Sequence, residues 1–120
     1  MTLELKEAEY NSCLVISIFG EVDMGSSPQL RTKIIRSVNE GHVNLILDLT
    51  SVDFLDSAGL GTIIGALRRV RSQNGDLLLV CPEERIQSIF MLCDLDKVFK
   101  FYLTSNEAVD AYKGINSLWT

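Results

Sequence analysis

Residues 45–64 read LILDLTSVDFLDSAGLGTII, and this stretch decides the fold. Its first part predicts a strand from Val43 to Leu49, because leucines alternate along one face and Ile46 adds burial on the other. Residues 50–56 are expected to form a loop. A helix follows, and Gly75 lies just past its end. The apolar stripe of this helix consists of Leu60, Ile63, Ile64, Leu67 and Val70.

Strands and helices alternate on both sides of this stretch. The other predicted strands are residues 3–7, 13–19, 77–81 and 98–103. The other predicted helices run from Ser26-Ser27-Pro28 to Gly41, from Pro82 to Cys93, and from the capping box Thr104-x-x-Glu107 through Tyr112. A serine just before Pro28 is expected to cap its helix by accepting bonds from free backbone N–H groups. Residues 20–25 are expected to be a loop.

The connections between these elements predict the topology. The short turn at residues 10–12 joins the first two strands as an antiparallel hairpin, whereas crossover helices imply parallel, right-handed connections elsewhere. We therefore predict one α/β domain over residues 1–120. Its mixed, mostly parallel sheet should have an antiparallel N-terminal strand, with crossover helices mainly on one face.

Composition excludes several function classes. The 120 residues carry 11 Lys and Arg against 16 Asp and Glu, and this net charge of -5 argues against direct nucleic-acid binding. No apolar run approaches the ~20 residues needed to cross a bilayer, and the alternating N-terminus lacks a signal-peptide core, so no membrane association and a cytoplasmic location are expected. The lone histidine gives no zinc constellation, and neither a metal nor a cofactor is expected.

Three cysteines bear on the redox chemistry of the chain. Cys13, Cys81 and Cys93 are odd in number, widely spaced and set among apolar neighbours. This pattern is typical of reduced packing residues and not of a disulfide framework.

Polar side chains follow two strands that should be neighbours. Glu21 and Asp23 come after the second strand, and Asp53, Asp56 and Ser57 come after the third. Because functional groups gather at the carboxyl ends of parallel strands, the two loops should lie side by side. The simpler interpretation is that Asp56 and Ser57 merely cap a helix and that Gly59 permits close packing.

Ser57 could have three chemical roles. As a nucleophile it would need a base, but His42 begins the strand that this loop ends and should lie roughly 20 Å away. The nucleophile-elbow pattern also fails, because Leu55 stands where its first glycine should be. No GxxxxGK loop supports phosphate binding. The remaining role is phosphoacceptor, since a helix N-terminus favours an anion. The sequence therefore predicts no catalytic residue.

Two segments of the sequence carry a specific resemblance to a known protein family. Gly20-Glu21-Val22-Asp23, together with residues 47–60, resembles the STAS-domain family of anti-sigma-factor antagonists, and residues 95–99 and 105–109 also match. One departure is Asp94, where relatives often carry glycine. Aspartate tolerates a left-handed backbone, so this departure should alter a partner-facing loop and not the fold.

The resemblance implies a partner switch. Ser57 would be phosphorylated by a partner that is both anti-sigma factor and serine kinase, and a PP2C-type phosphatase would restore the serine. Unphosphorylated protein would bind the kinase and free the sigma factor. The residues implied to flank the phosphosite or bind the partner are Gly20, Glu21, Asp23, Asp56, Ala58 and Gly59.

Two alternatives stay open at this point. One is a receiver-like domain phosphorylated on an aspartate, although Asp48 lies two residues before its strand loop and the N-terminal hairpin is out of place. The other is a STAS scaffold module that is never phosphorylated.

Overall fold

The computed structural model describes residues 3–117, with side chains up to residue 113; the expected domain also included residues 1–2 and 118–120, which lie outside the described part. Its strands are β1 (Glu4–Glu9), β2 (Leu14–Val22), β3 (Asn44–Leu55), β4 (Asp76–Val80) and β5 (Lys100–Tyr102). Its helices are α1 (Ser27–Asn39), α2 (Ser57–Arg71), α3 (Glu84–Leu92) and α4 (Ser105–Ser117).

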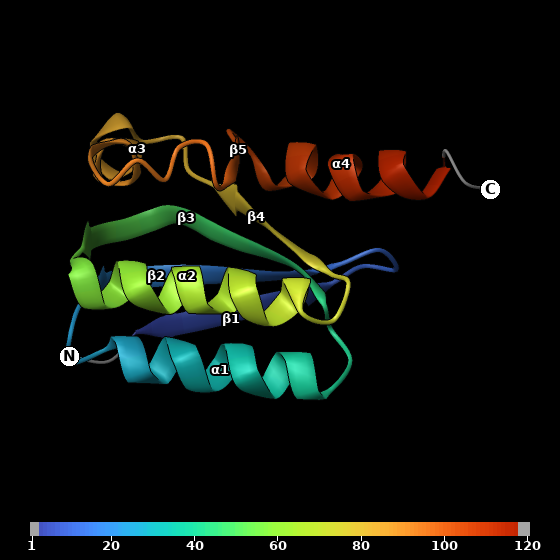
Figure 1. The fold of residues 1–120 in the computed structure, drawn as a ribbon, viewed down its shortest axis with the longest axis horizontal. Coiled ribbons are helices and arrows are strands. Elements are labelled where there is room, and N and C mark those ends of the chain that lie inside the picture. The colour runs from blue at the N-terminus through green and yellow to red at the C-terminus, as the bar shows by residue number, and fades with distance from the viewer. Residues whose placement is uncertain (1–2, 118–120) are drawn as a thin grey trace.

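The five strands form one sheet whose spatial order equals their order in the chain (Figure 1). β1 pairs antiparallel with β2, and every other pair is parallel. Because each strand joins the same growing edge, the right-handed crossovers place α1, α2 and α3 on one face. α4 covers the opposite face. The predicted α/β class, the antiparallel N-terminal strand and the crossover helices on one face are confirmed.

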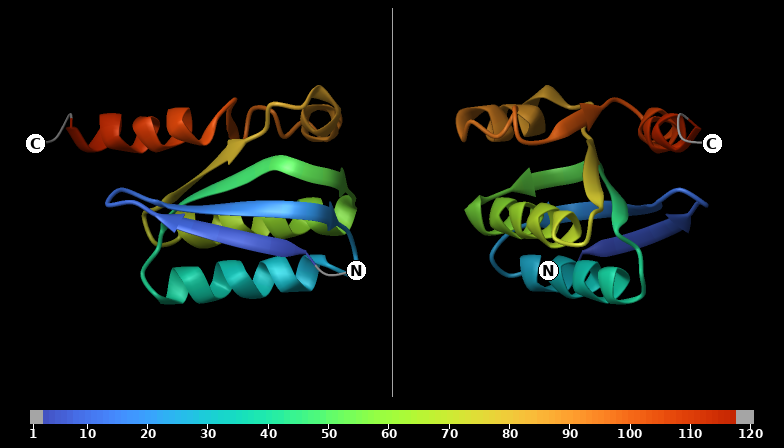
Figure 2. Two further views of the ribbon diagram at one scale, coloured as in Figure 1. Left: turned by 180° about the vertical axis from the view of Figure 1, so that it is seen from behind. Right: turned by 45° about the vertical axis from the view of Figure 1, so that its right-hand side comes forward.

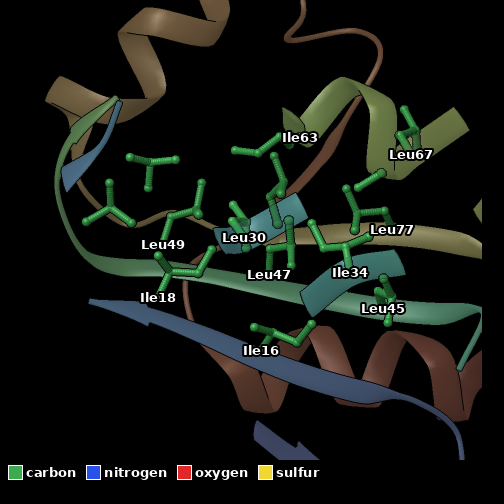
Figure 3. Close-up of a cluster of buried hydrophobic side chains, with 14 of the residues drawn as sticks. Ile16, Ile18, Leu30, Ile34, Leu45, Leu47, Leu49, Ile63, Leu67 and Leu77 are labelled. Atoms are coloured by element: carbon green, nitrogen blue, oxygen red, sulfur yellow. The ribbon is translucent and has the colours of Figure 1, made fainter. Parts of the chain in front are cut away.

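Two apolar layers hold the sheet between these helices. In the larger layer, Ile16, Leu45 and Leu47 of the strands lie beneath Leu30 of α1 and Ile63 of α2, and all five side chains are buried (Figure 3). This alternation of inward leucines and isoleucines provides the apolar layer on which α1 and α2 lie side by side, with α2 over β3 and β4.

The smaller layer attaches α4 to the far face. Ala108, Val109 and Tyr112 pack against Val15 and other strand residues. The Tyr112 hydroxyl donates a hydrogen bond of 2.9 Å to the backbone carbonyl of Leu45, and burial raises the pKa of this phenol. The two views of Figure 2 show α4 extending away from the sheet toward the C-terminus.

Tyr112→Phe is expected to destabilise the domain by about 1–2 kcal/mol, because the Leu45 carbonyl loses a buried donor. The measurement is the free energy of unfolding in urea. Tyr102→Phe is the matched control, since Tyr102 is half-buried and its hydroxyl makes no hydrogen bond to the described residues. Equal losses in the two variants would contradict the role assigned to the bond.

The strands extend further than the sequence predicts. Residues 20–22 and 50–55 were expected to be loops, but they complete β2 and β3. The two segments pair with each other in the sheet, for example Val22 with Leu55, and register shifts after Ser17 and Gly20 interrupt the pairing. These irregularities break the alternation that marks a strand in sequence, which is why the expectation was wrong.

Four smaller expectations about ends and turns are also settled. α3 begins at Glu84 and not at Pro82. β5 starts only at Lys100, because the amides of Val98 and Phe99 both donate to the Leu95 carbonyl in a turn before it. Thr104 and Glu107 form the expected capping interactions at α4, with bonds to the amides of Glu107 and Leu103. Asp94 has a φ of 56°, so this aspartate does occupy a left-handed position.

Candidate functional site

Asp56 joins two segments that are far apart in the sequence. It precedes α2 in an extended conformation, and its Oδ1 accepts a hydrogen bond of 2.9 Å from the Gly59 amide, which caps the helix. Its Oδ2 accepts from the Met24 amide at 3.1 Å, and its own amide donates to the Val22 carbonyl at 3.2 Å. The expected cap and the expected adjacency of the two segments are both confirmed.

Ser57 is the first residue of α2 and its side chain is exposed. Its hydroxyl makes no hydrogen bond within the part of the chain that the structure describes. Two other helices also begin with serine, but Ser27 of α1 is buried and Ser105 of α4 is half-buried. Ser57 is therefore the helix-initiating serine that an external reagent can reach.

Gly59 sets the distance between α2 and the ends of β2 and β3. A Cβ atom at this position would lie 2.5 Å from the Val22 carbonyl oxygen and 2.8 Å from side-chain carbons of both Val22 and Leu55. Only a residue without a Cβ fits, so the expected close packing is confirmed. The start of α2 rests directly on the strand end that carries the Gly20–Asp23 segment.

Residues 23–26 form a tight turn directly after β2, and this turn is held by its own side chains. The Ser26 hydroxyl donates to the Glu21 carbonyl and accepts from the Asp23 amide, while Asp23 Oδ1 accepts from the Ser26 amide at 2.9 Å. Ser26 therefore does not cap α1, contrary to expectation, because its hydroxyl is already engaged inside the turn. Gly20 lies within β2 beside one of its register shifts, where its φ of 117° suits a residue without a Cβ.

The other predicted site residues occupy different parts of this region. Glu21 is half-buried in β2, where it pairs with Phe54, and Asp53 is exposed on β3. Ala58 is half-buried and lines a groove between α1 and α2.

Sequence reasoning missed two exposed apolar side chains near Ser57. Met24 is 77% exposed, and Phe54 is 45% exposed. Each lies in a segment that Asp56 or the β2–β3 pairing holds beside the start of α2. An apolar residue set among acidic and small residues at a strand end was the signal that could have identified them.

Chemical groups outside this region bear on what the site can do. His42 lies two residues before β3, at the end opposite Ser57, and its Nε2 lies 3.2 Å from Glu9 Oε1, so no imidazole serves Ser57. Between residues 3 and 117, no group of three or more His, Cys, Asp or Glu side chains is placed to hold a metal ion, and no helix is long and apolar enough to cross a membrane.

The three cysteines are free thiols. Burial raises the pKa of the Cys13 thiol and raises that of Cys81 to about 11, so both are inert packing residues. The expectation that Cys93 packs in the interior was wrong, because this residue follows the last turn of α3 and is exposed.

Asp56→Ala is expected to cost about 1 kcal/mol of stability, because the α2 cap is lost. Asp56→Asn should keep the cap through its carbonyl oxygen but lose the bond from the Met24 amide, since its second atom is then a donor. Unfolding in urea and hydrogen exchange of the Met24 amide measure the two effects separately. Equal destabilisation by both substitutions would contradict this division of roles.

Asp23 should make the stability of the domain depend on pH. The Ser26 amide donates to the Asp23 carboxylate and lowers its pKa below the ordinary value. The resulting stability is complete above the unfolded-state pKa of about 4 and is lost as the pH falls through the lower folded-state value. The stability advantage of the wild type over Asp23→Asn should therefore shrink in urea titrations carried from pH 7 to pH 3. A difference that does not change with pH would contradict the assignment.

Comparisons with known proteins agree with this geometry. The STAS domain family matches residues 5–108. The anti-sigma F factor antagonist of Lysinibacillus sphaericus is 30% identical over 103 residues, which is 85% of this chain and 87% of that protein. The chain belongs to the STAS-domain family of anti-sigma-factor antagonists.

Two solved structures extend the likeness to three dimensions. The anti-sigma factor antagonist SpoIIAA in its unphosphorylated form is 25% identical, with a TM-score of 0.74 over 93% of this chain and 98% of that one. The Bacillus cell fate determinant SpoIIAA in the phosphorylated form is 26% identical, with a TM-score of 0.70 over 91% of this chain and 97% of that one.

Proposed function

We propose that this protein is an anti-sigma-factor antagonist that is itself not an enzyme and whose binding is switched by phosphorylation of Ser57. Unphosphorylated protein binds an anti-sigma factor that is also a serine kinase, and the sigma factor is released. Phosphorylated protein leaves the kinase until a PP2C-type phosphatase removes the phosphate. Residues 1–120 act as one domain, and the switch operates in the cytoplasm, where sigma factor and ATP meet.

The observation that carries this proposal is the placement of Ser57. It is an exposed hydroxyl at the first position of α2, directly after a carboxylate that joins α2 to the turn at residues 23–26. The absence of a base beside it suits a substrate serine, whose activation is the task of the kinase. The likeness to an antagonist solved in both unphosphorylated and phosphorylated forms adds support.

Electrostatics explains how a phosphate at this position would act. The N-terminus of α2 favours an anion, because its first amides lack partners within the helix. The modification adds about -1.5 to -2 charge next to Asp56, which already carries a negative charge in its helix-capping role. A partner that covers this surface would then meet a charge it has to desolvate. Couplings of this kind typically amount to about 1–3 kcal/mol, or roughly 5–150-fold in affinity.

The receiver-like alternative does not fit the topology. Doubly wound sheets of that kind have the order 2-1-3-4-5 with helices on both faces, whereas this sheet follows chain order and begins with an antiparallel strand. Asp48 accepts hydrogen bonds from the amide and hydroxyl of Thr50 within its own strand. The scaffold alternative shares the fold and differs only in whether Ser57 is modified.

The test is to incubate the protein with the anti-sigma factor kinase of its own genome and ATP, and to map the modified residue by mass spectrometry. We expect a single hydroxylamine-stable phosphate on Ser57, and binding of the kinase that falls when this phosphate is present. Kinase binding without phosphorylation would support the scaffold. A hydroxylamine-labile phosphate would support the receiver-like hypothesis. If the protein did not bind the kinase at all, the proposed antagonist function would be wrong.

A further inference from the structure

The charges of this chain are strongly segregated between its helices. α1 and α2 together contain six basic side chains and no acidic one. The rest of the 120-residue chain contains the other five basic residues and all sixteen acidic ones. In a protein with a net charge of -5, the two adjacent helices on one face of the sheet therefore carry basic charges and no acidic ones (Figure 1).

Most of these cations are uncompensated. Lys33 pairs with Glu7 and Arg71 with Asp76, but no carboxylate of the described residues lies within 4.0 Å of the four remaining arginines. These are Arg31, Arg36, Arg68 and Arg69. Arginines in the last turn of a helix complement the helix dipole, which accounts for Arg36, Arg68 and Arg69 as local features but not for Arg31, which lies in the first half of α1.

A groove lies between the two helices on this face. It has a volume of about 340 Å³. Arg31 of α1 and Arg69 of α2 line it, and Ile34 and Ile35 contribute apolar surface. Gly61 and Gly65 also line it, and a Cβ atom at either position would meet nothing within 4 Å, so this part of the groove is open. Ala58 lines it too, and this residue directly follows Ser57.

We propose that the groove between α1 and α2 binds an acidic segment of the anti-sigma factor, with Arg31 and Arg69 as the residues that recognise its carboxylates. This inference rests on the proposed function and adds the chemistry of the contact. Guanidinium groups bind carboxylates through two parallel hydrogen bonds, so two arginines in one groove favour a segment with repeated Asp or Glu.

The groove begins next to Ser57, so a phosphate on this serine would change the electrostatic potential of the groove. A phosphate on Ser57 would lie beside Ala58, where the groove begins. The phosphate and the acidic segment would then be like charges at one site, so the modification weakens the contact directly. Nucleic acid is the less favoured occupant, because its extended negative charge would also face the acidic remainder of the chain.

The test compares two charge-reversed proteins of equal net charge. Arg31→Glu/Arg69→Glu alters the groove, whereas Lys97→Glu/Lys113→Glu makes the same change away from it, at two exposed lysines that have no carboxylate partner among the described residues. Affinity for the anti-sigma factor kinase is measured by calorimetry at low and high salt, and circular dichroism confirms that each protein folds. The milder pair Arg31→Gln/Arg69→Gln replaces the first should it fail to fold.

We expect the groove variant to lose about tenfold or more in affinity at low salt and to show a flatter salt dependence, with the lysine variant close to wild type. Equal losses in both variants, alongside wild-type binding and Ser57 phosphorylation, would overturn the groove and leave the proposed function standing. Failure of the wild type to bind would overturn both. If a fluorescent DNA duplex bound the protein and this binding depended on Arg31 and Arg69, the groove would be a nucleic-acid site and the inference would be wrong.

Discussion

Ser57→Ala is expected to abolish phosphorylation while leaving the complex with the anti-sigma factor kinase intact. The side chain is exposed and its hydroxyl makes no bond to the described residues, so its removal costs the fold little. The helix cap comes from Asp56 and is unaffected. Incorporation of labelled phosphate and the dissociation constant of the complex are the two measurements.

Ser57→Asp should weaken kinase binding, although by less than a phosphate does, because one carboxylate carries about half of the phosphate charge. Ser105→Ala is the matched control, since Ser105 begins α4 as Ser57 begins α2. This control should be phosphorylated and bound like the wild type. Loss of kinase binding in Ser57→Ala, or phosphorylation of that variant, would contradict the assignment of Ser57 as the phosphorylated residue that switches binding.

Gly59→Ala is expected to destabilise the domain by about 2–3 kcal/mol, since the added methyl group overlaps backbone that cannot move cheaply. The nearest obstacle is the Val22 carbonyl, 2.5 Å from the new Cβ. Relief of this overlap requires α2 to move away from the ends of β2 and β3, which also separates Ser57 from the turn at residues 23–26. Kinase affinity should therefore fall together with the free energy of unfolding.

Gly61→Ala is the stability control for this prediction. It lies on the same helix, but its Cβ would meet nothing within 4 Å. Alanine at an open helical position typically raises stability by about 0.5–1 kcal/mol. If both alanines stabilised the domain, the close contact at Gly59 would not be the constraint that fixes α2.

Local sequence signals were sufficient for most of the architecture. Regular alternation identified the buried part of β3, and helical spacing identified α2, because these elements pack against a flat, apolar layer. The short turn at residues 10–12 correctly gave the antiparallel pair. The adjacency of Asp56 and the segment that follows β2 could be predicted from topology alone, since both lie at the carboxyl ends of neighbouring parallel strands.

The details that failed depend on contacts between distant residues. The extension of β3 to Leu55 exists because β2 pairs with it through register shifts, and no local pattern encodes such a shift. Ser26 looked like a helix cap, but its hydroxyl is taken by Glu21 and Asp23. The groove between α1 and α2 needed the relative placement of two helices, which a stripe of apolar residues does not specify.

The long pairing of β2 with β3 reaches the residues just before Ser57, so the surface around this serine is ordered by the sheet before any other protein arrives. An incoming molecule then meets a rigid shape, and the encounter need not wait for a segment to fold. Association should accordingly be rapid for the unmodified protein, and most of the variation in affinity should lie in the lifetime of the complex.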